Sequence, residues 1–93
     1  MKITKAIVSS SHLLRKLQEL KAQEEYMVSF SKARKEIHID TVTMQCECSN
    51  DCVYKIAFNR ISRLIEVLLL LEDQPITIAI DDDGWLYIKE AIL

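Results

Sequence analysis

The chain has few of the residues that build phosphate loops and membrane spans. Its 93 residues include one glycine and one proline, and a glycine-rich phosphate loop requires several glycines. No apolar run is long enough to cross a bilayer, since the longest, residues 67–71, is far short of a span. The opening residues also lack the apolar stretch of a signal peptide. We therefore expect a cytoplasmic protein that makes no contact with a membrane.

Cysteine is also scarce, and its count is odd. Three cysteines fit a reducing compartment better than a disulfide framework. Cys46, Cys48 and Cys52, with His38 upstream, offer the thiolate and imidazole ligands that zinc prefers. However, the sequence has no paired Cys-x2-Cys unit, and Cys46 and Cys48 fall on the apolar face of an expected strand. The pattern favours core packing over metal binding.

Candidate catalytic groups have simpler explanations. Residues 81–83 are three aspartates that would suit a hard cation, but aspartates before Gly84 are ordinary turn chemistry. His12 and His38, the two histidines, have no serine or cysteine nucleophile in a recognisable arrangement. The serines at 9–11 are better explained as helix caps. We therefore predict no enzyme activity, no catalytic residue, no cofactor and no metal.

Composition is that of an ordinary small globular domain. Hydrophobic residues make up 49% and charged residues 28% of the chain, and its length predicts one domain, residues 1–93. A domain this small buries a modest share of its surface, so pairing with another copy would matter energetically. The net charge of −2 predicts neither tight nonspecific DNA binding nor a polybasic membrane contact.

The most informative pattern is a doubled order of elements. A strand, an amphipathic helix and two further strands are expected in each half of the chain. An offset of 50 aligns the two halves, pairing Lys5 with Lys55, Leu14 with Leu64, Leu17 with Val67, Leu20 with Leu70, Val28 with Ile78 and Phe30 with Ile80.

In the first half, residue spacing predicts a strand, capping serines, a helix and a strand pair. The expected ranges are a strand at 2–8, a helix at 12–23, a strand at 26–31, a basic turn at 32–35 and a strand opening at 37. Apolar residues then move from odd to even positions at Asp40 and Thr41, which indicates a bulge or a break into two strands. The alternation continues to Cys48.

The second half repeats this order with clearer signals. We expect a strand at 52–58, Asn59 as the N-cap of a helix at 60–71, and Pro75 as the first residue of a strand. A hairpin turn at 82–84 leads into a final edge strand at 85–90. The predicted core stripe of the second helix comprises Ile61, Leu64, Ile65, Leu68 and Leu69. Hairpin connections imply an α+β fold, which we predict as one antiparallel sheet with two helices on one face.

Two surfaces are candidates for binding. The second helix is apolar almost all round, and Val67, Leu70 and Leu71 exceed what one sheet face would cover. Trp85 and Tyr87 add aromatic surface on the expected edge strand, where interfaces favour it. These five residues predict self-association, as a dimer or larger oligomer, or binding to a protein partner.

Basic residues on the two helices suggest a second possibility. If both helices pack on the same side, their outer faces would contact phosphates through four side chains. These are Arg15, Lys16, Arg60 and Arg63. The competing interpretation is a solvated helix face, whose charge is diluted by nearby glutamates.

The order of elements, a β-α-β-β series twice over, resembles one domain of a DNA sliding clamp, the processivity-factor fold. The resemblance covers nearly the whole chain and lies in residues 1–4 with Leu13, Leu14 and Leu17, in residues 40–46, in residues 58–71, and in residues 75–80 with the hairpin at Gly84. It implies helices that face DNA and edge strands that join domains into a ring. This chain carries one domain where the family carries two or three, and its helices are less basic than a DNA channel requires.

The leading hypothesis is a non-enzymatic interaction module that self-associates through edge strands or the second helix, in a DNA-replication or mobile-element setting. The alternative is a DNA-binding protein that contacts phosphates through the basic helix faces.

Overall fold

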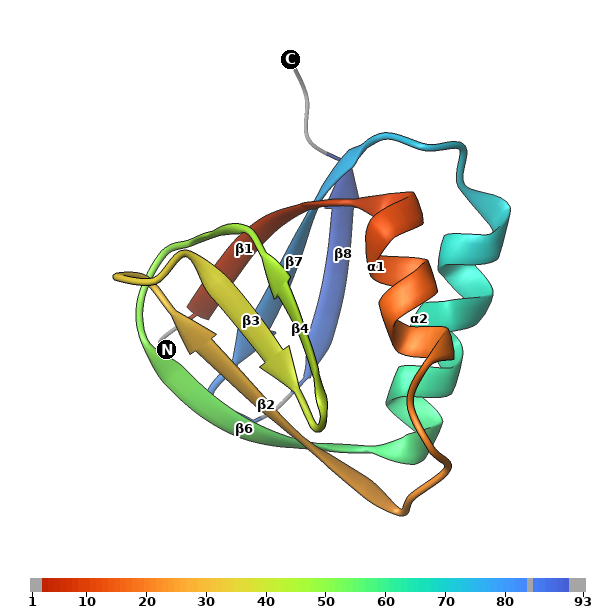
Figure 1. Ribbon diagram of the computed structural model, residues 1–93, viewed down its shortest axis with the longest axis horizontal. Coiled ribbons are helices and arrows are strands. Elements are labelled where there is room, and N and C mark those ends of the chain that lie inside the picture. The colour runs from red at the N-terminus through yellow and green to blue at the C-terminus, as the bar shows by residue number, and fades with distance from the viewer. Residues whose placement is uncertain (1–2, 84, 91–93) are drawn as a thin grey trace.

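The computed structural model describes residues 3–83 and 85–90, which form two helices and eight strands (Figure 1). In chain order the elements are β1 (Ile3–Ser9), α1 (Ser10–Gln18), β2 (Glu25–Ser31), β3 (Glu36–Ile39), β4 (Val42–Gln45), β5 (Glu47–Cys48), β6 (Cys52–Ala57), α2 (Phe58–Leu70), β7 (Pro75–Asp81) and β8 (Leu86–Glu90). The α+β class and the strand opening at Pro75 are as predicted. Gly84 of the predicted hairpin turn lies outside the described residues.

The strands form two antiparallel sheets of four, so the prediction of one sheet is wrong. One sheet has the order β5-β1-β7-β8 and the other β4-β3-β2-β6. The parity change at Asp40 marks a break, because Asp40 adopts a left-handed φ of 53° in the turn between β3 and β4. After β4 the chain leaves its sheet, and β5 pairs with β1 instead. Met44, Cys46 and Cys48 remain buried throughout this change of partner.

Helix α1 begins two residues earlier and ends five residues earlier than the predicted range of 12–23. The predicted serine cap is present, since the Ser9 hydroxyl accepts a hydrogen bond from the His12 amide. At the other end, the Tyr26 hydroxyl donates to the Lys21 carbonyl at 2.8 Å and accepts from the Gln23 amide at 3.2 Å. These bonds hold the loop after α1 in a non-helical conformation.

Helix α2 begins at Phe58, so the predicted cap at Asn59 is wrong. Ala57 occupies the N-cap position and has no capping side chain. The amide of Phe58 donates instead to the Glu24 carbonyl at 2.8 Å. A backbone group from the loop before β2 therefore satisfies a donor that a capping side chain would otherwise satisfy. The predicted strand at 52–58 consequently ends at Ala57.

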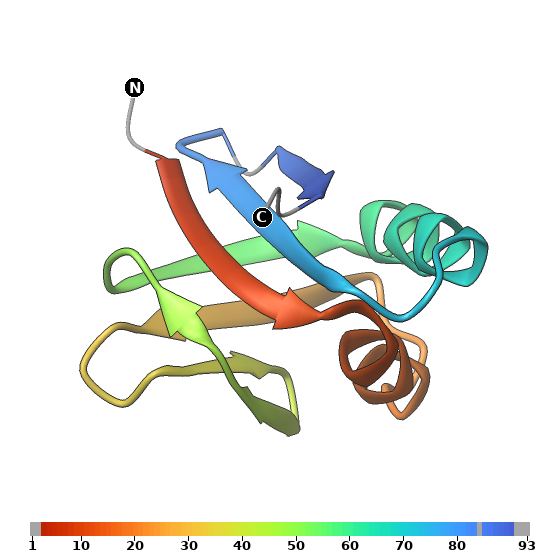
Figure 2. The ribbon, with the colours of Figure 1, turned by 90° about the horizontal axis from the view of Figure 1, so that it is seen from above.

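The two helices lie side by side on one side of the sheets (Figures 1 and 2). Both sheets and both helices contribute to one core, which includes Leu13 and Leu17 from α1, Leu64 and Leu68 from α2, and Ile78 from β7. The buried side-chain polar atoms of the described residues all have hydrogen-bond partners. None of the described helices is long and apolar enough to cross a bilayer.

Candidate interaction surface

The outer side of α2 exposes three large aliphatic side chains. Leu70 is 86% exposed, Leu69 is 60% exposed and Val67 is 42% exposed. Leu69 was expected in the core stripe, and its exposure contradicts that expectation. Leu71, a predicted interface residue, is partly buried and packs against the core. The helix packs against α1 and β6, and these neighbours leave the three side chains exposed.

The second part of this surface is strand β8. It pairs with β7 and forms the edge of its sheet, with no strand on its outer side among the described residues. Trp85, just before the strand, and Tyr87 within it are each about half exposed. An edge strand presents backbone N–H and C=O groups that another chain can pair with. The final strand is an edge strand, as predicted, but Trp85, predicted within it, lies just before its first residue.

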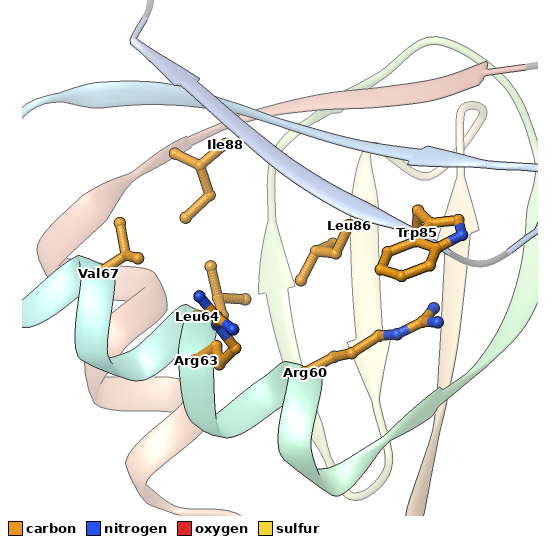
Figure 3. A pocket seen from close by; sticks show the side chains of 7 residues that line it. All are labelled: Arg60, Arg63, Leu64, Val67, Trp85, Leu86 and Ile88. Carbon is orange, nitrogen blue, oxygen red and sulfur yellow. The ribbon is translucent and has the colours of Figure 1, made fainter.

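A groove of about 520 Å³ separates α2 from β8 (Figure 3). Its lining consists of Arg60, Arg63, Leu64, Val67, Trp85, Leu86 and Ile88. Arg60 and Trp85 lie at one end of the groove and Val67 and Ile88 at the other, because α2 and β8 run alongside each other (Figure 3). The groove has an apolar floor and two guanidinium groups, and none of its lining residues is a carboxylate.

One end of the groove is closed by a cation–π contact. The guanidinium carbon of Arg60 lies 4.2 Å from the centroid of the Trp85 ring, within the range in which such contacts are attractive. The residues are 25 positions apart, so no helical or strand spacing links them in the sequence. Both residues were predicted to be functional, but on different surfaces.

The position of Trp85 is set by a buried aspartate. Asp81 is 2% exposed, and its carboxylate accepts hydrogen bonds from the amides of Asp83 and Trp85 and from the Tyr87 hydroxyl, at 2.9–3.0 Å. Burial raises the pKa of Asp81, but these hydrogen bonds and the charge of Arg60 outweigh burial and hold the pKa below its ordinary value. The aspartates at 81–83 thus have the turn role that the sequence favoured.

The four predicted DNA-contacting residues form two pairs. Arg15 and Lys16 are on α1, where Lys16 forms an ion pair of 3.8 Å with Glu19. The positive charge of Arg15 contributes to the lowered pKa of Asp73, which arises mainly from hydrogen bonds donated by the Ser11 and Ser9 hydroxyls. Arg60 and Arg63 instead lie on α2, at the groove. Each of the two basic side chains of α1 therefore has a carboxylate nearby, Asp73 for Arg15 and Glu19 for Lys16.

A chain of polar groups on β3 and β4 was not identified from the sequence. The Thr43 hydroxyl lies 2.9 Å from Nδ1 of His38, and Nε2 of His38 lies 3.1 Å from Oε1 of Glu36. Thr43 faces His38 directly in the strand register, and Glu36 is two residues before His38 on the same face. Strand pairing alone accounts for this arrangement. The three residues lie on β3 and β4, whereas the groove is lined by residues of α2 and by residues 85–88.

The thiols of Cys46 and Cys48 are adjacent and buried. Their Sγ atoms lie 3.5 Å apart, at the point where the chain passes from β4 to β5. Burial, followed by the neighbouring thiol and the charge of Glu47, raises the pKa of Cys46 to about 12, and burial also raises the pKa of Cys48. Protonated thiols within an apolar core fit the predicted packing role. His38, which was considered with the three cysteines as a zinc ligand, hydrogen-bonds to Glu36 and Thr43.

Comparisons with protein-family models, with curated proteins and with solved structures found no match.

Proposed function

We propose that this protein is a non-enzymatic interaction module that self-associates through the outer side of α2 and the edge strand β8. The observation that carries this proposal is the exposure of Leu70, which is 86% exposed. Leu69 and Val67 extend the same surface, and the half-exposed Trp85 lies toward the other end of α2, beside Arg60. Exposed apolar residues that cluster in this way are typical of association sites.

Two further features support association by this surface. Within the described part of the chain β8 is an edge strand, so a second copy would gain main-chain hydrogen bonds as well as apolar contacts. The domain is also small, and covering the α2 surface would add burial that one copy lacks.

We further propose that the fold is a sliding-clamp-like repeat, in a DNA-replication or mobile-element setting. The support is that each helix is followed by an antiparallel strand pair, α1 by β2 and β3 and α2 by β7 and β8. Strands β2 (Glu25–Ser31) and β7 (Pro75–Asp81) differ in position by the offset of 50 found in the sequence. In this proposal a ring would form by pairing of β8 with an edge strand of the next copy.

Self-association is tested by measuring mass in solution for Leu70→Glu and for a matched control, Met27→Glu. Met27 is also exposed, at 45%, but it lies on β2, a central strand of the other sheet. Light scattering at high concentration should find a dimer or larger species for the unmodified chain and for Met27→Glu, and a monomer for Leu70→Glu. A monomeric unmodified chain would contradict the proposal.

Direct DNA contact is a second candidate because the two helices lie side by side, as that hypothesis requires. Gel shifts at increasing salt would test it, since counterion release makes such binding weaken steeply. Replacing Arg15 and Lys16 by glutamate should then abolish the shift. No shift at low salt would exclude this function.

A further inference from the structure

We propose that the groove between α2 and β8 binds an extended segment of a different protein, which adds as an antiparallel strand to β8 and presents an apolar side chain followed, two residues later, by an acidic one. The bound segment would pair with the β8 edge that the proposed self-association also uses, so the two would compete for that edge, whereas Leu70 is not among the groove's lining residues.

The shape of the groove indicates a strand because the other half of the chain contains a similar arrangement. After α1, strands β2, β3 and β4 are neighbours in one sheet, and the third of them, β4, packs against α1. After α2, β7 and β8 are neighbours, and the position beyond β8 is open among the described residues. An added strand there would lie beside α2 much as β4 lies beside α1, with its backbone paired to β8.

The lining determines which side chains such a strand would carry. Leu86 and Ile88 both line the groove, so alternate residues of an added strand would also face it. At the Val67 and Ile88 end the walls are aliphatic and favour an apolar side chain. Toward the other end, the exposed guanidinium group of Arg63 favours a carboxylate, which arginine binds in a bidentate geometry.

The direction of the chain follows from antiparallel pairing. Strand β8 runs from the Arg60 end to the Val67 end of the groove. A strand antiparallel to β8 therefore enters at the aliphatic end and reaches the arginines later, so its apolar residue precedes its acidic residue. A peptide of the same composition but reversed order would place each group against the wrong wall.

The probe that tests this is the capped peptide acetyl-Thr-Val-Thr-Ile-Thr-Glu-Thr-amide, carrying a fluorophore for anisotropy measurements. Its control is acetyl-Thr-Glu-Thr-Ile-Thr-Val-Thr-amide, which has the same composition in reverse. Trp85, the sole tryptophan of the chain, lines the groove and provides a second, label-free signal. We expect the first peptide to bind about fivefold more tightly than the reversed one, the scale of one exposed ion pair.

Charge reversal provides the matched protein variants. Arg63→Glu should weaken binding of the first peptide and improve binding of a version with lysine in place of glutamate. Arg34→Glu is the control, because Arg34 is an exposed arginine on the turn between β2 and β3. The Leu70→Glu variant, which should be monomeric and leave the β8 edge open, should bind the peptide at least as tightly as the unmodified chain, which separates this inference from the proposed self-association.

Four outcomes would overturn the inference. These are equal binding of the two peptide orders, no binding at about 1 mM peptide, an unchanged affinity for Arg63→Glu, and displacement of the peptide by single-stranded DNA. Displacement by DNA would assign the arginines to phosphate contacts.

Discussion

The guanidinium of Arg60 lies over the indole ring of Trp85, at 4.2 Å from the ring centroid, and so connects the first turn of α2 to the start of β8. The indole is about half exposed, so the contact does not depend on deep burial. Both residues also line the groove. This pair therefore couples the stability of the β7–β8 hairpin to the shape of the candidate binding site.

Replacing Arg60 by alanine should lower the free energy of unfolding by about 0.5–1 kcal/mol, the value of an exposed cation–π contact. Arg60→Lys should retain part of the stabilisation, because the ammonium group can also lie over the ring. Urea unfolding followed by circular dichroism would measure both changes. Equal stability of Arg60→Ala and the unmodified chain would show that the contact is energetically neutral.

The sequence predicted most elements because their signals are local. Alternating side chains identify β2 and β7, the apolar spacing identifies both helices, and Pro75 identifies the first residue of a strand. The left-handed conformation of Asp40 separates β3 from β4, so the predicted break into two strands, and not the alternative bulge, is present. Each of these features is determined by neighbouring residues along the chain.

The division into two sheets is a non-local feature that the alternation of apolar and polar residues could not indicate. Between β4 and β5 the chain exchanges its partner β3 for β1, while Met44, Cys46 and Cys48 continue to alternate inward. Alternation records which face is buried but not which strand lies alongside. The groove was missed for a similar reason, because it depends on the distance between α2 and β8.

The acid sensitivity of the fold should depend on Asp81. Its folded-state pKa lies below the ordinary value of 3.8, so its carboxylate contributes stability above that pH, and this contribution is lost as the pH falls through the folded-state value. Asp81→Asn should therefore destabilise the protein more at pH 7 than at pH 3. Urea midpoints at the two pH values measure this difference.

The matched control for Asp81 is Asp83→Asn, which removes an exposed carboxylate from the same turn while leaving its backbone amide to donate to Asp81. Its effect should be small at both pH values. If Asp81→Asn cost the same at pH 3 as at pH 7, the ionised carboxylate would have no special role in the turn.

The contact between the start of α1 and the loop that joins α2 to β7 should depend on Ser10. Its hydroxyl donates to the Glu72 carbonyl and accepts from the Gln74 amide, both at 3.0 Å, and the residue is 2% exposed. Ser10→Ala should cost about 1–3 kcal/mol, because it removes two part-buried hydrogen bonds, each worth about 0.5–1.5 kcal/mol. The control Ser11→Ala, whose hydroxyl bonds to the exposed side chain of Asp73, should cost less. Equal losses in urea unfolding would contradict this role.

The three cysteines should differ in their reaction with iodoacetamide. The pKa of Cys46 is raised from 9.0 to about 12, which lowers its thiolate fraction at pH 8 about a thousandfold, and the thiolate is the reactive form. Cys48 is likewise buried with a raised pKa, whereas Cys52 is partly exposed. Intact-mass measurement should find one adduct on the folded chain and three in denaturant. The variant Cys52→Ser should acquire none while folded, and rapid addition of two or more adducts to the folded chain would show that the β4–β5 crossing opens readily to solvent.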